Sequence, residues 1–114
     1  MESFVVNNFI VKLAETEEEY RGLYKLRYFD LLRNYNSSIQ NDQEEDKDEY
    51  DKYCDHLIII DSDNNEVVGT YRLIKKSHLS VLKTFLTESE FDLTPLKNYE
   101  VLEVGRAVVK EEYR

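Results

Sequence analysis

Two apolar runs joined by a short polar turn constrain the fold more than any other feature of this sequence. Residues 57–60 read Leu-Ile-Ile-Ile, residues 61–65 are Asp, Ser and Asn, and a second apolar run follows over 67–74. An unbroken aliphatic run is typical of a strand that is covered on both faces. Two such runs around a polar turn predict a β-hairpin, which needs further layers packed against it.

Upstream of this hairpin, the sequence predicts one strand and one helix. Residues 9–13 form a strand-like apolar segment after the Asn7-Asn8 interruption. Thr16 opens a T-E-E-E capping box, in which two side chains satisfy free backbone amides at a helix start. Apolar residues then recur at steps of three and four, which predicts a helix over about residues 17–33. Arg27 falls within this apolar stripe, and a buried guanidinium needs an acidic partner.

The segment that follows is polar and strongly acidic. Residues 40–55 contain eight acidic residues and two lysines, a net charge of −6 out of −9 for the whole chain. Such a run of like charge, taken alone, favours a solvated loop. Tyr50 and Tyr53 stand among the acids, and aromatic side chains indicate that the end of this loop packs against the domain.

No spacing of residues predicts a metal site or an activated nucleophile. The pattern Asp46-x-Asp48-x-x-Asp51 lacks the glycine and the glutamate of a calcium loop. Cys54 lies two residues from His56 without an activating context, so we expect a small buried thiol. A single cysteine cannot form an internal disulfide, which fits a reducing cytoplasm. We therefore expect a cytoplasmic protein without a bound metal.

Size and net charge exclude several kinds of partner. A chain of 114 residues allows one small domain. With 24 acidic and 15 basic residues it carries a net charge of −9, which disfavours nucleic acid and anionic lipid surfaces. No apolar run approaches the roughly 20 residues of a membrane-spanning helix, and the first residues do not resemble a signal peptide.

The second half of the chain adds further elements to the sheet. Residues 79–86 have helical spacing, Thr94-Pro95 has the signature of a brief helical turn, and residues 101–109 are strand-like. The order strand, helix, loop, strand, strand, helix, strand predicts an α/β (α+β) domain with a mainly antiparallel sheet and flanking helices.

Three charged residues interrupt these strands. Arg72 lies in the second strand of the hairpin, and Glu103 and Arg106 lie in the last strand. Isolated charges in apolar strands are unfavourable unless they are paired, so these residues are either mutual partners or site residues. Strict alternation places Glu103 and Arg106 on opposite faces, whereas a bulge at Gly105 would turn both towards one cleft.

Six segments in the same order resemble a group of N-acyltransferases. They are L-R-Y (26–28), D-x-x-D (48–51), C-D-H-L-I (54–58), V-V-G-T-Y-R-L (67–73), E-S-E-F-D-L (88–93) and L-E-V-G-R (102–106). The group is the acyl-carrier-protein-dependent ornithine N-acyltransferases, often labelled hemolysin-like, which are similar to the acyl-homoserine-lactone synthases. Both belong to the GNAT superfamily. The lactone synthases usually carry a tryptophan after the first helix, and this chain has none, which favours the ornithine group.

The resemblance implies transfer of an acyl group from a thioester, on acyl carrier protein or coenzyme A, to a small amine such as ornithine. It implies a functional set made of one glutamate, two aspartates and three arginines, which by position are Arg27, Asp48, Asp51, Arg72, Glu103 and Arg106. In this set Glu103, beside Arg106, is the expected base for the amine proton. Asp48 and Asp51 are expected to hold a cationic substrate, with the arginines orienting these acids or binding a carboxylate.

The resemblance also implies that residues 1–114 form only the amino-terminal part of a GNAT-like domain, ending after the fourth predicted strand. The family's pantetheine-binding loop follows that strand, so no donor-binding residue is assigned here. We expect a fragment, or a domain completed by another chain. The sheet edge at residues 101–109 is then open and prone to pair with a second copy. The alternatives are a lactone-synthase-like enzyme and a catalytically inactive binding or regulatory module.

Overall fold

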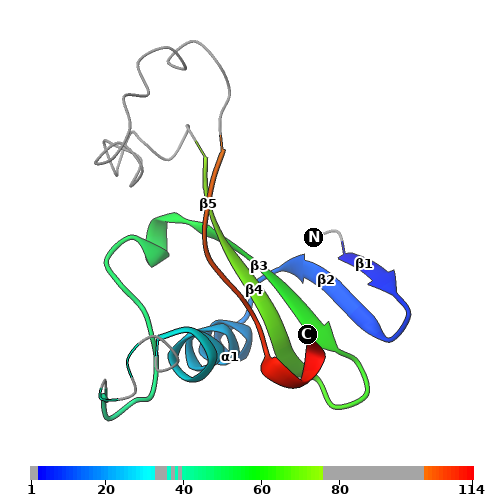
Figure 1. The fold of residues 1–114 in the computed structure, drawn as a ribbon. Helices are drawn as coiled ribbons and strands as arrows, with labels where there is room; N and C mark the ends of the chain where they lie inside the picture. The colour runs from blue at the N-terminus through cyan, green and yellow to red at the C-terminus, as the bar shows by residue number, and fades with distance from the viewer. Residues whose placement is uncertain (1–2, 33–35, 37, 39, 76–101) are drawn as a thin grey trace.

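The computed structural model describes residues 3–32, 36, 38, 40–75 and 102–114, which form one five-stranded sheet and one main helix (Figure 1). The sheet order is β1-β2-β3-β4-β5, and every neighbouring pair is antiparallel. The strands are β1 (Ser3–Val6), β2 (Phe9–Leu13), β3 (Asp55–Asp61), β4 (Glu66–Lys75) and β5 (Leu102–Val109). This arrangement confirms the predicted α+β class with an antiparallel sheet.

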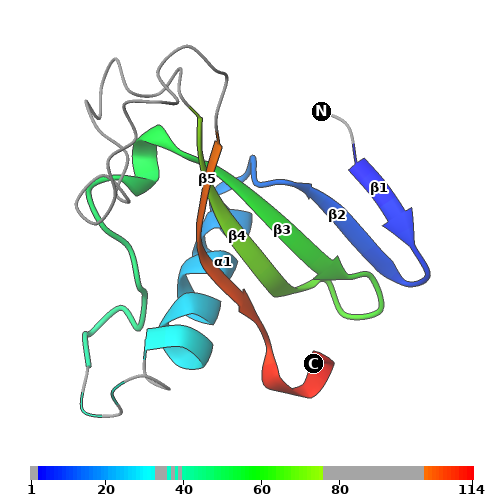
Figure 2. The ribbon, with the colours of Figure 1, turned by 45° about the horizontal axis from the view of Figure 1, so that its top comes forward.

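Helix α1 (Glu17–Arg27) packs on one face of this sheet (Figure 2). Its predicted capping box is present, because the Thr16 side chain accepts from the Glu19 amide and the Glu19 carboxylate accepts from the Thr16 amide. The α-helix ends earlier than predicted, at Arg27, and continues as a π-helix over Tyr28–Leu32. A π-helix differs from an α-helix by its i→i+5 hydrogen bonds, and five residues are too few for the apolar pattern to distinguish the two.

The core between α1 and the sheet is small and closely packed. Leu23 of α1 and Ile58 of β3 are fully buried, and Ala14 packs beside them. A Cβ atom at Gly22 would lie 2.9 Å from Cγ2 of Val67, closer than real Cβ contacts. Gly22 therefore allows the helix to approach β4 at this distance.

The hairpin β3–β4 forms where the sequence predicts it. Pairing runs from Asp55 opposite Leu73 to Asp61 opposite Glu66, with one irregularity between Ile59 and Ile60. Residues 62–65 make the turn and include Asn65 at a φ of 58°, a left-handed conformation that asparagine tolerates well.

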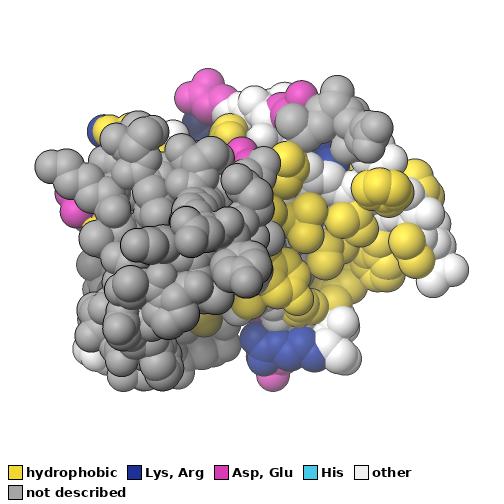
Figure 3. Space-filling model, turned by 90° about the horizontal axis from the view of Figure 1, so that it is seen from above, with side chains coloured by type: hydrophobic (Ala, Val, Ile, Leu, Met, Phe, Trp, Pro, Cys, Tyr) yellow, Lys and Arg dark blue, Asp and Glu magenta, His cyan; other side chains and the backbone are white. Residues whose placement is uncertain are grey.

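Strand β1 is an addition to the predicted sheet, which therefore has five strands in the described residues rather than four. Asn7 adopts a φ of 54° and turns the chain so that β1 pairs with β2. Asn7-Asn8, which interrupts the apolar segment in the sequence, is thus the turn of the β1–β2 hairpin. All four residues of β1 are exposed, with Val5 at 72%. When the molecule is seen from above, hydrophobic side chains gather on the described part of that face (Figure 3).

Strand β5 lies at the other edge of the sheet and contains a β-bulge. Gly105 pairs with Arg72 and Val108 pairs with Thr70, so two residues of β5 lie opposite Tyr71 alone. Of the two alternatives that the sequence left open, the structure therefore has the bulge, directly after Gly105, and its left-handed residue is Arg106 at a φ of 50°.

Several sequence predictions fall outside this description. The helix expected at 79–86 and the turn at Thr94-Pro95 lie outside the described residues. None of the helices in the described ranges combines the length and the apolar character that a membrane-spanning segment requires.

Candidate functional site

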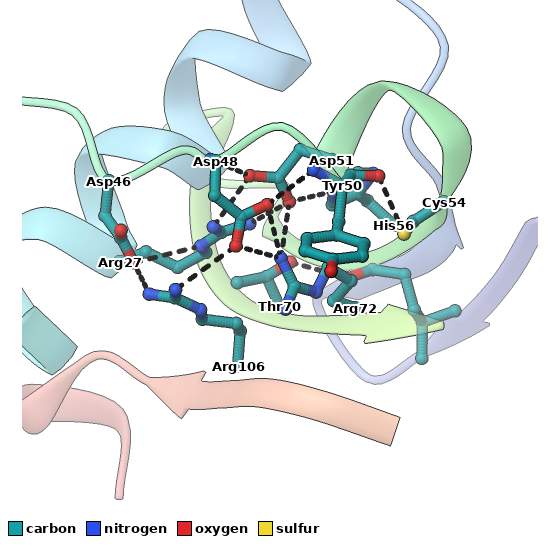
Figure 4. A network of polar contacts seen from close by, with 11 residues as sticks. Arg27, Asp46, Asp48, Tyr50, Asp51, Cys54, His56, Thr70, Arg72 and Arg106 are labelled. Atoms are coloured by element: carbon teal, nitrogen blue, oxygen red, sulfur yellow. Dashed lines mark hydrogen bonds and ion pairs between the residues drawn. The ribbon is translucent and has the colours of Figure 1, made fainter. Parts of the chain in front are cut away.

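The centre of the site is a buried ion pair between α1 and the acidic loop (Figure 4). Arg27 donates from Nη1 and Nη2 to the two carboxylate oxygens of Asp51, at 2.8 and 3.0 Å. The two side chains are only 1% and 2% exposed. A bidentate pair of this kind fixes the planes of both the guanidinium and the carboxylate. Because both groups are buried, neither charge is stable without the other.

The carboxylate of Asp51 receives three further contacts. His56 Nε2 lies 3.0 Å from Oδ1, Arg72 Nη1 lies 3.3 Å from the same oxygen, and the Asp48 amide donates to Oδ2 at 2.7 Å. Burial by itself would raise the pKa of Asp51, but the hydrogen bonds from His56 and Arg27 outweigh it and hold that pKa well below its usual range. Asp51 is therefore an anion, and His56 must carry its proton on Nε2 to donate to it.

His56 is held in place by aromatic rings of α1. Its imidazole meets the rings of Tyr20 and Tyr24 edge-on, with centroids 5.7 and 6.1 Å away. Its other ring nitrogen, Nδ1, is buried and has no hydrogen-bond partner in the described part of the chain. Burial raises the pKa of Tyr24 to about 12, so this phenol stays neutral beside the ionic residues.

The outer part of the network joins both sheet arginines to Asp48. Arg72 Nη1 donates to the two oxygens of Asp48 at 2.9 and 2.8 Å. Arg106 Nη2 donates to Oδ2 of Asp48 at 3.3 Å. Whereas Arg72 is 3% exposed, the side chains of Arg106 and Asp48 are 30% and 28% exposed. Solvent therefore reaches the network at the Asp48–Arg106 end.

Asp46 connects the inner and outer parts. Its Oδ2 accepts from Arg106 Nη1 at 2.6 Å and lies 3.4 Å from Arg27 Nε. Its amide donates to the carbonyl of Tyr24 near the end of α1, at 3.0 Å. Three arginines and three aspartates thus meet in one network, and their formal charges cancel.

Cys54 lies at the edge of this network and is not an activated nucleophile. The thiol is buried, and its Sγ donates to the Tyr50 carbonyl at 3.0 Å. Burial raises the pKa of Cys54 to about 11, so almost none of it is thiolate at neutral pH. The sequence-based expectation of a small buried thiol is confirmed.

The structure brings five of the six predicted site residues together: Arg27, Asp48, Asp51, Arg72 and Arg106. For Glu103 it describes the backbone alone, in β5 opposite Ile74. The chemical roles assigned to these residues remain predictions. The acidic segment is less solvated than its charge run indicates, since Asp46 and Asp51 are buried by their arginine partners.

Two members of the network, Asp46 and His56, were not among the predicted site residues. The sequence contained a signal for both. Asp46, Asp48 and Asp51 follow one another at steps of two and three residues. His56 lies two residues before Ile58 in β3, so both side chains point to the same face of the strand, which is the face that α1 covers. Among the described residues, no group of His, Cys, Asp and Glu is arranged to hold a metal ion.

A separate cavity of about 370 Å³ is lined by residues of α1, of the π-helix that follows it and of the start of β4. Lys25, Phe29 and Val67 are among its lining residues, and none of the arginines or aspartates of the network lines it.

Comparison with known proteins identifies the family. The model of the acetyltransferase (GNAT) domain matches residues 26–114, which include every residue of the network. The chain therefore belongs to the GNAT acyltransferases. No solved structure matches it significantly.

The curated relatives are N-acyltransferases and a lactone synthase. The chain is 31% identical to L-ornithine N(alpha)-acyltransferase of Brucella abortus, over 91% of this chain and 41% of that protein. Identity to the Rhodobacter capsulatus protein of the same name is also 31%, over 91% and 44%. Acyl-homoserine-lactone synthase of Aliivibrio fischeri is 30% identical, over 85% and 50%. The chain thus spans about two fifths to one half of the length of these relatives.

Proposed function

We propose that this chain forms the acceptor side of an N-acyltransferase that moves an acyl group from a thioester to a small primary amine such as ornithine. The likeness to L-ornithine N(alpha)-acyltransferases over 91% of the chain carries the proposal. In the reaction the amine nitrogen bonds to the acyl carbon, the carbon–sulfur bond breaks, and the thiol of acyl carrier protein or coenzyme A leaves. The amine gives up one proton, for which Glu103 is the proposed base.

The geometry favours a division of labour within the predicted set. Both oxygens of the Asp51 carboxylate are hydrogen-bonded and the side chain is only 2% exposed, so Asp51 suits the role of holding Arg27, Arg72 and His56 in place. Asp48 and Arg106 reach solvent and present opposite charges side by side. An amino acid carries an ammonium and a carboxylate, which match these two groups.

Amine-dependent release of thiol tests the proposed function. The chain is incubated with acyl carrier protein thioester or acyl-CoA and ornithine, and free thiol and the N-acyl product are measured. Replacing the proposed base (Glu103→Gln) is expected to lower the rate by about 10²–10⁴-fold. Glu18→Gln, at an exposed position of α1, is the matched control. Release of thiol that does not depend on an amine would contradict an N-acyltransferase.

Two alternatives give different results in the same assay. The similarity to the Aliivibrio fischeri protein favours a lactone-synthase-like activity, for which mass spectrometry would detect an acyl-homoserine lactone instead of an acyl-ornithine. An inactive binding or regulatory module releases no thiol with any donor.

We further propose that two copies associate through β5. This strand is last in the sheet order, and its outer edge pairs with no other strand in the described residues. Unpaired edge strands readily pair with a second chain. Size-exclusion chromatography with light scattering is expected to give a dimer. A stable monomer at the same concentration would contradict this proposal.

A further inference from the structure

We propose that Asp46 is a positioning residue of the acceptor site, which holds the guanidinium of Arg106 where an acceptor carboxylate would bind. This inference rests on the proposed function, and it concerns a residue outside the set that the family resemblance implies. The contact that carries it is the 2.6 Å hydrogen bond from Arg106 Nη1 to Asp46 Oδ2.

Asp46 is fixed independently of Arg106. Its amide is hydrogen-bonded to the Tyr24 carbonyl, which ties the loop to the end of α1. Its carboxylate also lies beside Arg27, and Arg27 is held rigidly by both oxygens of Asp51. Because Asp46 is only 7% exposed, water competes little for its oxygens. The position of Asp46 therefore follows from the buried part of the network.

Arg106 depends on its partners to a greater degree. Its backbone is left-handed, at a φ of 50°, within the bulge of β5, and its side chain is 30% exposed. Left-handed residues other than glycine persist where their surroundings hold them. Its second described partner, Asp48, is 3.3 Å away and is shared with Arg72. The contact of Arg106 with Asp46 is the shorter of the two, and among the described contacts Asp46, unlike Asp48, is not shared with Arg72.

Loss of the Asp46 charge should thus release Arg106 without unpairing Arg27 from Asp51. An acceptor carboxylate would then meet a guanidinium that is no longer pre-oriented, and acceptor binding would weaken. The proton transfer assigned to Glu103 does not involve Asp46. The expected signature is therefore a rise in KM for the amine acceptor with a much smaller change in kcat.

The test compares Asp46→Asn with Asp42→Asn, which removes the same charge from an exposed position of the loop. For Asp46→Asn we expect KM for ornithine to rise by about tenfold, the effect of one charge-assisted hydrogen bond, with kcat within about threefold of the parent. Asp42→Asn should leave both constants unchanged. Equal constants in Asp46→Asn and the parent, or a fall in kcat at constant KM, would overturn the proposal.

A second readout does not require catalysis. Nitrogen-15 NMR of the Arg106 guanidinium, assigned with Arg106→Lys, is expected to show restricted rotation in the parent and faster rotation in Asp46→Asn, where only the longer contact with Asp48 remains. If no donor supports thiol release, the proposed function fails while this readout still decides the positioning role. Free rotation of Arg106 in the parent protein would overturn the role by itself, including the case in which Asp46→Asn does not fold.

Discussion

The two ends of the ionic network differ in their access to water, and this difference separates support from recognition. At the inner end, the side chains of Arg27 and Asp51 are 1% and 2% exposed. At the outer end, those of Arg106 and Asp48 are 30% and 28% exposed. A buried charge that loses its partner is strongly destabilising, whereas an exposed one is rehydrated. The inner pair should therefore govern stability and the outer pair should govern ligand binding.

Replacing Arg27 by an apolar residue should have the largest effect on stability. Arg27→Leu leaves Asp51 buried with one strong partner removed, and we expect a loss of about 3–5 kcal/mol in the free energy of unfolding. Urea denaturation followed by circular dichroism measures it. Arg21→Leu, at an exposed position of the same helix, is the control and should change stability by less than about 0.5 kcal/mol. Similar midpoints for the two variants would refute the assignment of Arg27 to a buried support.

Asp51→Asn should have the next largest effect, and its size should depend on pH. The pKa of Asp51 is lower in the folded chain than in the unfolded chain, so its charge stabilises the fold above the unfolded pKa of about 3.9. This contribution is lost as the pH falls below that value towards the folded pKa. We expect Asp51→Asn to be about 2–4 kcal/mol less stable at pH 7, with the gap narrowing below about pH 4.

Denaturation curves of the two proteins between pH 7 and pH 3 test this expectation. Asp42→Asn, in the exposed part of the same loop, should follow the parent curve throughout. If the difference in free energy of unfolding between the parent and Asp51→Asn were constant from pH 7 to pH 3, the ionised carboxylate would not be the source of the stability.

Arg106→Gln should have the smallest effect on stability. Arg106 and its partner Asp48 are reached by solvent, and the buried Asp46 keeps its contact with Arg27, so we expect a change below about 1 kcal/mol that shrinks further in 1 M salt. Thermal unfolding at low and high salt measures it. A loss as large as that of Arg27→Leu would remove the distinction between the inner and outer ends.

Local signals in the sequence predicted most of the described fold. The capping box at Thr16 located the start of α1, and apolar runs located β2 and the hairpin β3–β4. These features depend on neighbours along the chain, which a sequence displays directly. Strand β1 was not predicted because it is a four-residue edge strand whose side chains are all exposed, and no burial pattern marks it.

The site was predicted in part, for a different physical reason. Arg27, Arg72 and Arg106 stood out because a charge within an apolar segment needs a partner. The family resemblance named Asp48 and Asp51 among the acids near these arginines, but the contact of Asp46 with Arg27 and Arg106 depends on how the acidic loop packs, which the sequence does not specify. The charge run favoured a solvated loop, while in the structure two of its aspartates are among the more deeply buried residues.

The close approach at Gly22 has a consequence for the whole network. A larger side chain at position 22 would clash with Val67 and push α1 away from the sheet. Arg27 lies further along the same helix, so such a shift would draw its guanidinium away from Asp51. The spacing that brings opposite charges together is thus set in part at a residue that carries no charge.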